Sequence, residues 1–342
     1  MKFVCRNCAT GSLHVADKNW SVLRSRPRDR GTIMEWKPSR VLQLFGSIIA
    51  IAFTTGSLVH AQVQLKYRYE PGQTRYYELK QTLGTVSHVS DREITNHIAQ
   101  HLQIATTVNE VEKDGSAVLA KSIVRVQMEA TQPGSDEPMT YDSASGNEAT
   151  GPFGMIANTL SSLVKKQILI TVSEQGDIRK VDIPQELLQQ FSGNGPGLTG
   201  LNTPEGVEKM LSQGSVIFPD KTLNVGDQWT RNMSTELPFG KMNSTIVFTY
   251  AGRTKDGLDR INATTKISLE PKPGSPFQVQ MKASDGEGVY LFDTRRGCIL
   301  ASGLKQTMNL ELSAIGQKLE QTVTTDISMR LVNPNQTAQG PK

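Results

Sequence analysis

The side chains with the widest scope for chemistry in this sequence are histidines, cysteines and paired carboxylates. Three of the histidines lie close together in the sequence. His97 and His101 stand four residues apart, with His88 nearby. On a helix this spacing would bring two imidazoles to one metal ion. The surrounding residues alternate as in a β-strand, where the two rings lie on one wet face about 13 Å apart. We therefore expect solvent-exposed histidines and no metal site.

A glycine-rich GxGxxG pattern runs from Gly195 to Gly200. Such a pattern binds a pyrophosphate only between a strand and a helix, where backbone N–H groups meet the phosphate oxygens. Here the pattern follows a short helical segment and contains Pro196, and no βαβ arrangement surrounds it. We interpret it as a linker and expect no nucleotide cofactor.

The remaining reactive side chains also favour structural roles. Cys298 follows Gly297 at the start of a predicted strand, which is typical of a buried thiol, and no GxSxG nucleophile elbow occurs. Asp285 and Glu287 lie in a glycine-containing stretch that we interpret as a turn. The Cys5-x-x-Cys8 pair lacks the second ligand pair that a zinc site needs. We assign no catalytic, cofactor-binding or metal-ligating residue and expect a protein that is not an enzyme.

The N-terminal region has the features of an export signal. Lys37 and Arg40 precede an uncharged apolar run, Val41–Phe53, which is shorter than the roughly 20 residues that a membrane-spanning helix needs. Small residues at positions −3 and −1 before Gln62 fit a signal-peptidase site. We predict an exported, periplasmic or extracellular protein whose mature chain begins at Gln62. No cysteine follows the site, so we expect no lipid anchor and no transmembrane span in the mature protein.

Residues 1–33 have no hydrophobic periodicity, and a signal peptide of ordinary length starts at Met34. We therefore expect translation to begin at Met34.

Residues 1–61 hold 9 of the 37 Lys and Arg and 3 of the 33 Asp and Glu, so the predicted mature chain has a net charge of −2. The basic character of the whole sequence therefore gives no support for nucleic-acid binding.

Period-two alternation is the main structural signal of the mature chain. Apolar and polar residues alternate from Leu319 to Leu331, in Ile94–Val108 opposite the histidines, and in Met308–Leu312. In Val118–Met128 we place Val118 and Val124 on the apolar face and Lys121 on the wet face. Strands with one wet face are typical of antiparallel sheets.

Turn motifs recur in the same order in two halves of the chain. Each half opens on a Gly turn, continues with a Lys-Asp-Gly hairpin and ends in a second glycine turn. The motifs are Pro71-Gly72-Gln73, Lys113-Asp114-Gly115 and Glu174–Ile178 in the first half, and Val225-Gly226-Asp227, Lys255-Asp256-Gly257 and Arg295–Ile299 in the second. We interpret them as two related β units, although Asp-Gly turns also recur by chance.

Helices are expected only in the middle of the chain. Thr203 is a good N-cap for an amphipathic helix that begins at Pro204 and ends before Gly214. Shorter helices are predicted at Pro184–Phe191 and Met155–Lys165. Thr131–Gly151 is predicted to be a loop.

Two phrases resemble a known family. Phe218–Trp229 (FPDKTLNVGDQW) and Tyr69–Tyr77 (YEPGQTRYY) are similar to turn-and-strand phrases of a bacterial family of exported proteins of unknown function. The resemblance implies two β-rich halves joined by a helical middle, and it implies no catalytic residue.

The predicted segments follow from these patterns. They are an extension at 1–33, a signal peptide at 34–61, a first β-rich unit at 62–192, a connector at 193–217, a second β-rich unit at 218–332 and a disordered tail at 333–342.

We predict an α+β, mostly β protein with curved antiparallel sheets of the open half-barrel type, similar at the level of fold to periplasmic lipoprotein carriers. The expected function is non-catalytic binding of a lipid or another apolar small molecule, because a concave apolar face buries an acyl chain at about 0.8 kcal/mol per CH₂. The alternatives are an envelope scaffold with a filled core, and a hydrolase with carboxylates drawn from distant strands. The protein partner is not indicated by the sequence.

Overall fold

The computed structural model describes most of the predicted mature chain. The described ranges are 62–89, 92–131, 137–145, 151–190, 203–213, 215–237, 239–275, 278–314 and 317–333. The predicted signal peptide, the Cys5/Cys8 pair, the Gly195–Gly200 pattern and most of the predicted tail lie outside these ranges.

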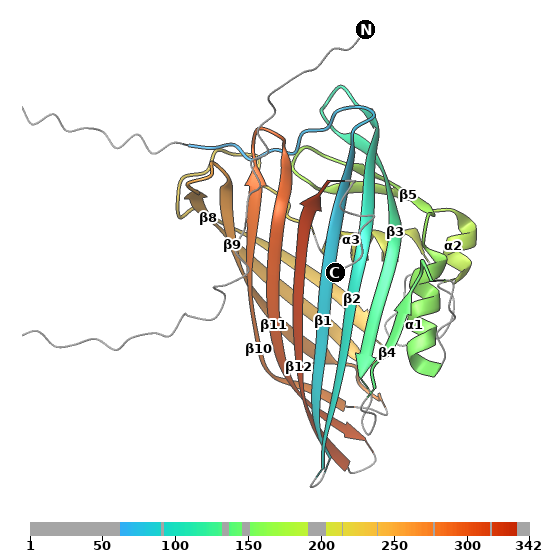
Figure 1. The fold of residues 1–342 in the computed structure, drawn as a ribbon. Coiled ribbons are helices and arrows are strands. Elements are labelled where there is room, and N and C mark those ends of the chain that lie inside the picture. Colours follow the sequence, from blue (N-terminus) through green and yellow to red (C-terminus); the bar gives the residue numbers. More distant parts are fainter. Residues whose placement is uncertain are drawn as a thin grey trace, which may run out of the picture. The chain divides into compact units, whose positions relative to one another are not determined.

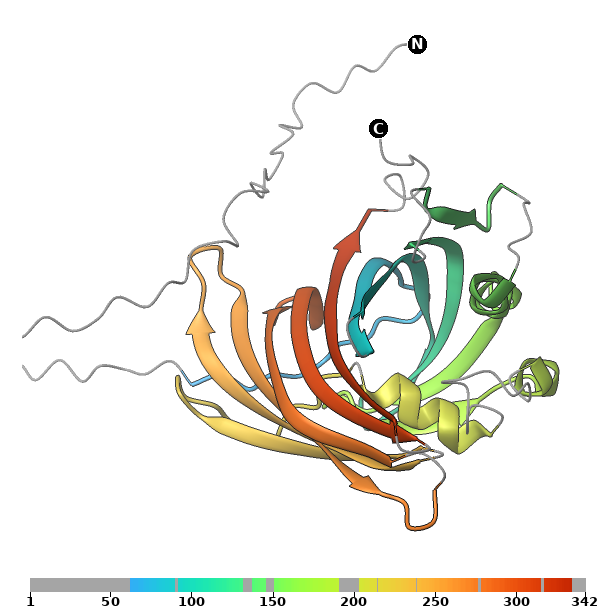
Figure 2. The same ribbon diagram turned by 90° about the horizontal axis from the view of Figure 1, so that it is seen from below.

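Twelve strands of the described residues form one antiparallel sheet (Figure 1). They are β1 Thr74–Val89, β2 Arg92–Val111, β3 Ala117–Thr131, β4 Met139–Asp142, β5 Gln167–Val172, β6 Ile178–Asp182, β7 Gln228–Leu237, β8 Gly240–Arg253, β9 Asp259–Pro271, β10 Gln278–Asp293, β11 Cys298–Ala314 and β12 Gln317–Val332. The sheet is bent into a deep curve and is open, with β6 at one end and β7 at the other (Figure 2). The predicted fold class is confirmed.

The strand order follows the chain in both halves, and the halves meet at its first and last strands. The order is β6-β5-β3-β2-β1-β12-β11-β10-β9-β8-β7, with β4 paired to β3. β1 pairs with β12 from Tyr76↔Val332 to His88↔Glu320. The two predicted β-rich units therefore share one continuous sheet.

Each half begins with the same hydrogen-bond pattern. A glycine with positive φ donates its backbone N–H to the carbonyl oxygen of a strand residue. The N–H of that strand residue then donates to the carbonyl oxygen of the residue that follows the glycine. The bonds, at 2.8 to 2.9 Å, are Gly72 N to Val108 O, Val108 N to Gln73 O, Gly226 N to Tyr250 O and Tyr250 N to Asp227 O. Because φ is 80° at Gly72 and 94° at Gly226, both positions favour glycine. The two halves therefore share the geometry of this turn, and the relation between the two units stays a prediction.

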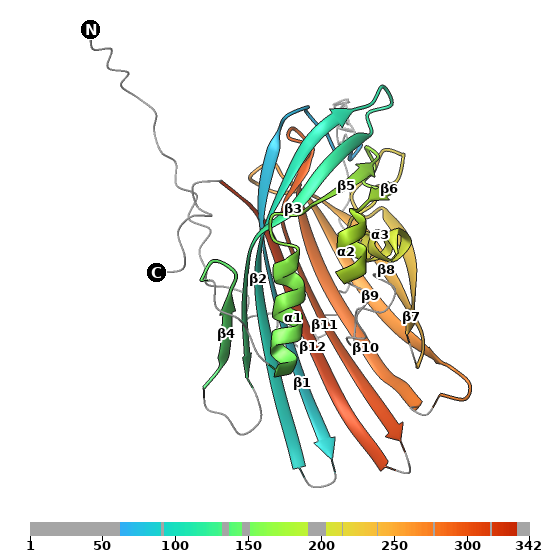
Figure 3. The ribbon, with the colours of Figure 1, turned by 90° about the vertical axis from the view of Figure 1, so that its right-hand side faces the viewer.

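Three helices lie on one side of the sheet (Figure 3): α1 Gly151–Ser162, α2 Gln185–Gln190 and α3 Pro204–Gln213. The Thr203 hydroxyl accepts the Gly206 N–H at 3.1 Å, which confirms the predicted N-cap of α3. The other two helices are confirmed with slightly shifted ends.

A β-bulge in β3 makes part of the predicted alternation wrong. The register with β2 shifts between Gln103↔Arg125 and Ile104↔Ile123, so Val124 is the extra residue. Before the bulge, Lys121 therefore shares the inner, helix-covered face with Leu119. Val118 points to the outer face, the reverse of the prediction for both residues, and Val124, which was predicted on the apolar face, is exposed.

Two segments that were predicted to be irregular are strands. Met139–Asp142, in the predicted loop, forms β4, because Tyr141 is buried against α1 and Asp142 pairs with Arg125 across the outer face. Asp285 and Glu287 lie inside β10, not in a turn. Gly286 allows the strand to continue, since the Gln306 side chain occupies the space that a Cβ would fill.

Candidate functional site

Three clusters of buried side chains cover only part of the inner face. One surrounds Phe218, Phe248 and Phe292, a second joins β3, β5 and β6 to α2 and α3, and a third packs α1 on β3. The first cluster draws on the end of β8, the start of β9, the end of β10 and the start of β11, and the other two lie on the β3–β6 side of the sheet.

The inner face of the central strands carries apolar side chains that are only half-buried and belong to none of these clusters. They are Leu83 of β1, Ile267 and Leu269 of β9, Met281 of β10, Leu304, Met308, Leu310 and Leu312 of β11, and Leu319, Val323 and Ile327 of β12. The predicted concave face of Ile, Val, Leu and Met is confirmed. We call this set the open inner face.

An apolar cavity of about 260 Å³ lies beside the open inner face. Its floor is formed by Tyr77 and Leu79 of β1, Ile104 of β2 and Met329 of β12, and Leu211 of α3 contributes to its cover. The other lining residues are Tyr67, Tyr69, Arg75, Thr106, Val108, Leu119, Lys121, Ile170, Val172, Gly176, Ile178, Ser215, Cys298 and Ile299. No carboxylate lines it among the described residues.

Tyrosines shape one wall of the cavity. Tyr67 stacks on Phe218 with ring centroids 5.1 Å apart and donates its hydroxyl to the Val216 carbonyl at 3.0 Å. Burial raises the pKa of Tyr67, Tyr69 and Tyr77. Their hydroxyls therefore stay neutral at physiological pH and line the cavity as polar groups without charge.

Helix α3 is held over the cavity by a cation from the far edge of the sheet. Arg231 of β7 donates to the carbonyl oxygens of Ser212 and Ser215, both at 2.7 Å. A cation at a helix C-terminus satisfies carbonyl groups that have no partner within the helix. The contact fixes Leu211 and Ser215, which both line the cavity.

Two cations line the cavity, and they differ in their partners. Arg75 donates through one nitrogen, Nη2, to the carbonyl oxygens of Arg68 and Arg296, at 3.0 and 2.9 Å. Lys121 makes no hydrogen bond or ion pair with any described residue, and burial lowers the pKa of its ammonium. The cavity is thus mainly apolar, carries two cations, and contains in Lys121 an ammonium group that has no partner among the described residues.

Cys298 begins β11 and lies at the cavity wall, 2% exposed. Burial raises the pKa of its thiol, so that the thiolate is disfavoured. The prediction of a buried thiol at a strand start is confirmed.

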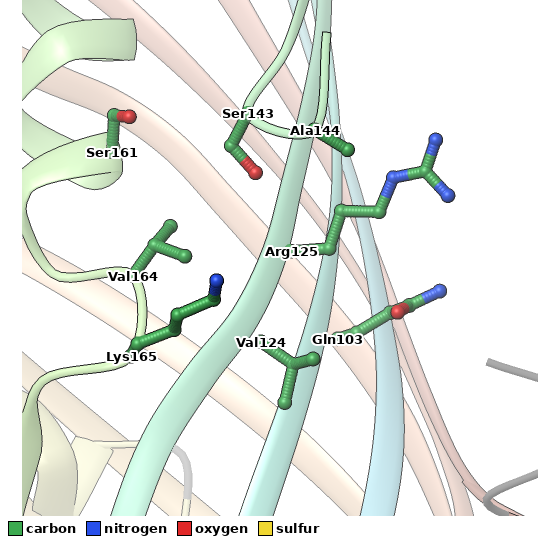
Figure 4. A pocket seen from close by; sticks show the side chains of 8 residues that line it. All are labelled: Gln103, Val124, Arg125, Ser143, Ala144, Ser161, Val164 and Lys165. Atoms are coloured by element: carbon green, nitrogen blue, oxygen red, sulfur yellow. The ribbon is translucent and has the colours of Figure 1, made fainter. Parts of the chain in front are cut away.

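A second hollow, of about 460 Å³, lies where β3 meets the end of α1. In Figure 4 its side chains do not converge: Arg125 and Gln103 extend away from Ser161 and Lys165. Arg125 is already paired with Asp142, its Nε at 3.0 Å from Oδ1. This hollow offers no free charged group from β3, so the apolar cavity is the stronger candidate.

The other residues with scope for chemistry are not brought together. His97 and His101 follow the outer side of β2, and His101 Nε2 lies 3.9 Å from Glu78 Oε1. His97 and His101 are both half-buried, not exposed as predicted, and Nε2 of His101 has no hydrogen-bond partner among the described residues. Asp285 pairs with Lys266 on the outer face. Within the described ranges, no cluster of three His, Cys, Asp or Glu side chains could hold a metal ion.

Sequence reasoning missed the cavity and its lysine. A basic residue in the largely apolar stretch Val118–Val124 was the available signal, and the unrecognised bulge at Val124 hid the direction in which Lys121 points.

Comparisons with known proteins give no family. No protein-family model matches the chain, and no curated protein matches its sequence. The resemblance to an exported bacterial family therefore stays a prediction.

Among solved structures, lipovitellin is similar, with 11% identity, a TM-score of 0.40, and coverage of 78% of this chain and 26% of lipovitellin. An outer-membrane channel from Pseudomonas putida F1 has 6% identity and a TM-score of 0.22, covering 78% of this chain and 97% of the channel. DynF of the dynemicin pathway of Micromonospora chersina has 7% identity and a TM-score of 0.20, covering 81% of this chain and 90% of DynF. At these TM-scores the similarities carry no functional argument.

Among the helices in the described ranges, none combines the length and apolar character needed to cross a bilayer.

Proposed function

We propose that this protein is an exported, non-catalytic binding protein for a lipid or another apolar small molecule, which it holds on the inner face of its curved sheet. The observation that carries the proposal is the apolar cavity beside the open inner face.

The open inner face carries apolar side chains that the three clusters leave only half-buried. Apolar surface that stays in contact with water costs roughly 25 cal/mol per Å². Polar side chains such as Gln81 and Thr325 lie between these apolar side chains, and a ligand that covers the face would bury the apolar ones. The outer face of the same strands is polar and carries ion pairs, such as Lys305–Asp326 at 3.5 Å. Only one face of the sheet is therefore suited to an apolar ligand.

The scaffold alternative requires a filled core, whereas the cavity between β1, β2, β3 and α3 is hollow. The hydrolase alternative requires converging ionisable groups of shifted pKa in a cleft. The ionisable groups of the cavity are tyrosines with raised pKa, one thiol with raised pKa and two cations. No carboxylate lines the cavity among the described residues, so the paired carboxylates that the hydrolase alternative requires are not brought together there, which favours binding over catalysis.

Native mass spectrometry of the protein, expressed with export in a bacterial host and purified without detergent, tests the proposal. We expect a reproducible additional mass that disappears on denaturation and is recovered as an extractable apolar compound. A ligand-free mass, together with no uptake of added lipid or apolar dye, would refute the proposal.

A further inference from the structure

Lys121 lines the cavity, and its ammonium group makes no hydrogen bond or ion pair with any described residue. It lies on β3 opposite Thr106 of β2 and Ile168 of β5, two residues after Leu119, which lines the same cavity. Its position on the inner face results from the bulge at Val124. The ammonium group is therefore held in the apolar cavity by the strand that forms its wall.

The surroundings of Lys121 contain no counter-charge. No Asp or Glu lines the cavity among the described residues, and the second cation there, Arg75, adds to the positive charge. Several other basic side chains of the sheet have a carboxylate within reach: Arg125 pairs with Asp142, Arg330 with Glu78 at 2.6 Å, and Lys282 with Glu311 at 3.1 Å.

A charged group in an apolar environment is unfavourable unless a partner compensates it. Because the surroundings of Lys121 disfavour its charged form, they lower the pKa of its ammonium group. A ligand that brings a negative charge into the cavity would pair with the ammonium and favour the charged form of the lysine.

We propose that the cavity binds the carboxylate end of a long-chain fatty acid, with Lys121 as the anchor of the carboxylate and the acyl chain laid along the open inner face. This inference rests on the proposed binding function and specifies the ligand class.

The geometry beyond the cavity suits a single acyl chain. The floor residues Leu79 and Met329 are direct partners on β1 and β12, and the same strands continue along the inner face through Leu83 and Ile327 to Val323. From Leu79 to Ser87 β1 spans about 27 Å at the usual strand rise, which accommodates an extended chain. A cavity of about 260 Å³ is itself below the range of about 300 to 1,000 Å³ of whole-ligand pockets, so it holds one end of such a molecule.

Isothermal titration calorimetry with the delipidated full chain tests the inference. The probes are palmitate, its uncharged analogue hexadecanol, and hexadecyl phosphate. The variants are Lys121→Met, which keeps the aliphatic stem without the charge, Lys121→Arg, which keeps the charge, and Lys180→Met as a control at an exposed lysine of β6 outside the cavity.

We expect the unmodified protein to bind palmitate at least about 10-fold more tightly than hexadecanol. In Lys121→Met this preference should disappear through weaker palmitate binding, whereas Lys121→Arg should keep part of it and Lys180→Met all of it. Lys121→Met should also melt at an equal or higher temperature than the unmodified protein, because it removes a half-buried charge that has no partner among the described residues.

The possible outcomes separate the two proposals. If the unmodified protein binds palmitate and hexadecanol equally, or if Lys121→Met keeps the preference, the anchor is wrong while the apolar-ligand function stands. Tighter binding of hexadecyl phosphate than of palmitate would overturn the carboxylate assignment. If none of the three probes binds, the proposed function fails together with the inference.

Discussion

Two cations of β3, Lys121 and Arg125, lie four residues apart on opposite faces of the same sheet. Arg125 faces outward, where two of its nitrogens pair with the Asp142 carboxylate of β4. Lys121 faces inward into an apolar cavity, where no described residue neutralises it. In a regular strand residues four apart share a face, so the bulge at Val124 creates the difference.

Arg125 therefore has a structural role, whereas the charge of Lys121 is available to a ligand. The Arg125–Asp142 pair joins β4 to β3 and has its full complement of partners. Lys121 imposes a cost on folding that no contact within the described chain offsets. The inner face thus holds the cation of β3 that no described side chain pairs with, and this is the charge that a ligand could use.

The largest effect should follow from filling the cavity. Thr106→Trp, on β2, places a large ring where the ligand is expected. Palmitate affinity should fall more than about 10-fold, which corresponds to about 1.4 kcal/mol. The control is Thr307→Trp at an exposed outer position of β11. If calorimetry shows that folded Thr106→Trp binds palmitate with unchanged affinity, the cavity is not the binding site.

A smaller effect is expected from a charge on the open inner face. Ile327→Glu places a carboxylate beside Leu304 of β11, along the path of the acyl chain, whereas Ser328→Glu places it on the outer face opposite Lys80. Because the negative charge disfavours burial of a chain, Ile327→Glu should weaken binding of palmitate about 3- to 10-fold. Ser328→Glu should leave binding unchanged. Equal effects of the two variants in dye-displacement titrations would mean that the faces do not differ in function.

The smallest effect concerns acid stability on the outer face. Hydrogen bonds from Arg125 lower the pKa of Asp142 to about 2 from the ordinary 3.8. A depressed carboxyl pKa stabilises the fold above the unfolded-state pKa, and this contribution is lost as the pH falls through about 2. Asp142→Asn should therefore flatten the dependence of unfolding free energy on pH between about 4 and 2. Since exposed ion pairs are worth about 1 kcal/mol or less, the change should be small.

Urea unfolding at several pH values measures this change. The same Asp142→Asn variant should bind palmitate like the unmodified protein, because the pair lies across the sheet from the cavity. A loss of palmitate binding in Asp142→Asn would show that the two faces are coupled.

The strand pattern was the part of the fold that could be predicted. The alternation of Leu319–Leu331 and the Lys-Asp-Gly hairpins correctly indicated β12 and the β2–β3 and β8–β9 turns. Both signals are local, since period two and turn chemistry depend on neighbours in the chain. The joining of the halves through β1 and β12 could not be predicted, because it depends on pairing between strands that are more than 200 residues apart in the sequence.

The candidate site was beyond prediction for a related reason. The bulge at Val124 is defined by the register with β2, and this register decides whether Lys121 faces ligand or water. Asp285 and Glu287 were misplaced because Gly286 and Gly288 are typical of turns, whereas Gly286 here makes room for the Gln306 side chain. In both cases contact across strands overrides the local signal.

Photo-crosslinking with two palmitate analogues tests the central claim most directly. One analogue carries a diazirine near the carboxylate and the other near the end of the chain. The account predicts that the first labels peptides of β3 and α3 around the cavity, that the second labels the inner face of β11 and β12, and that unlabelled palmitate suppresses both. Labelling confined to outer-face residues, or labelling that excess palmitate does not suppress, would contradict the account.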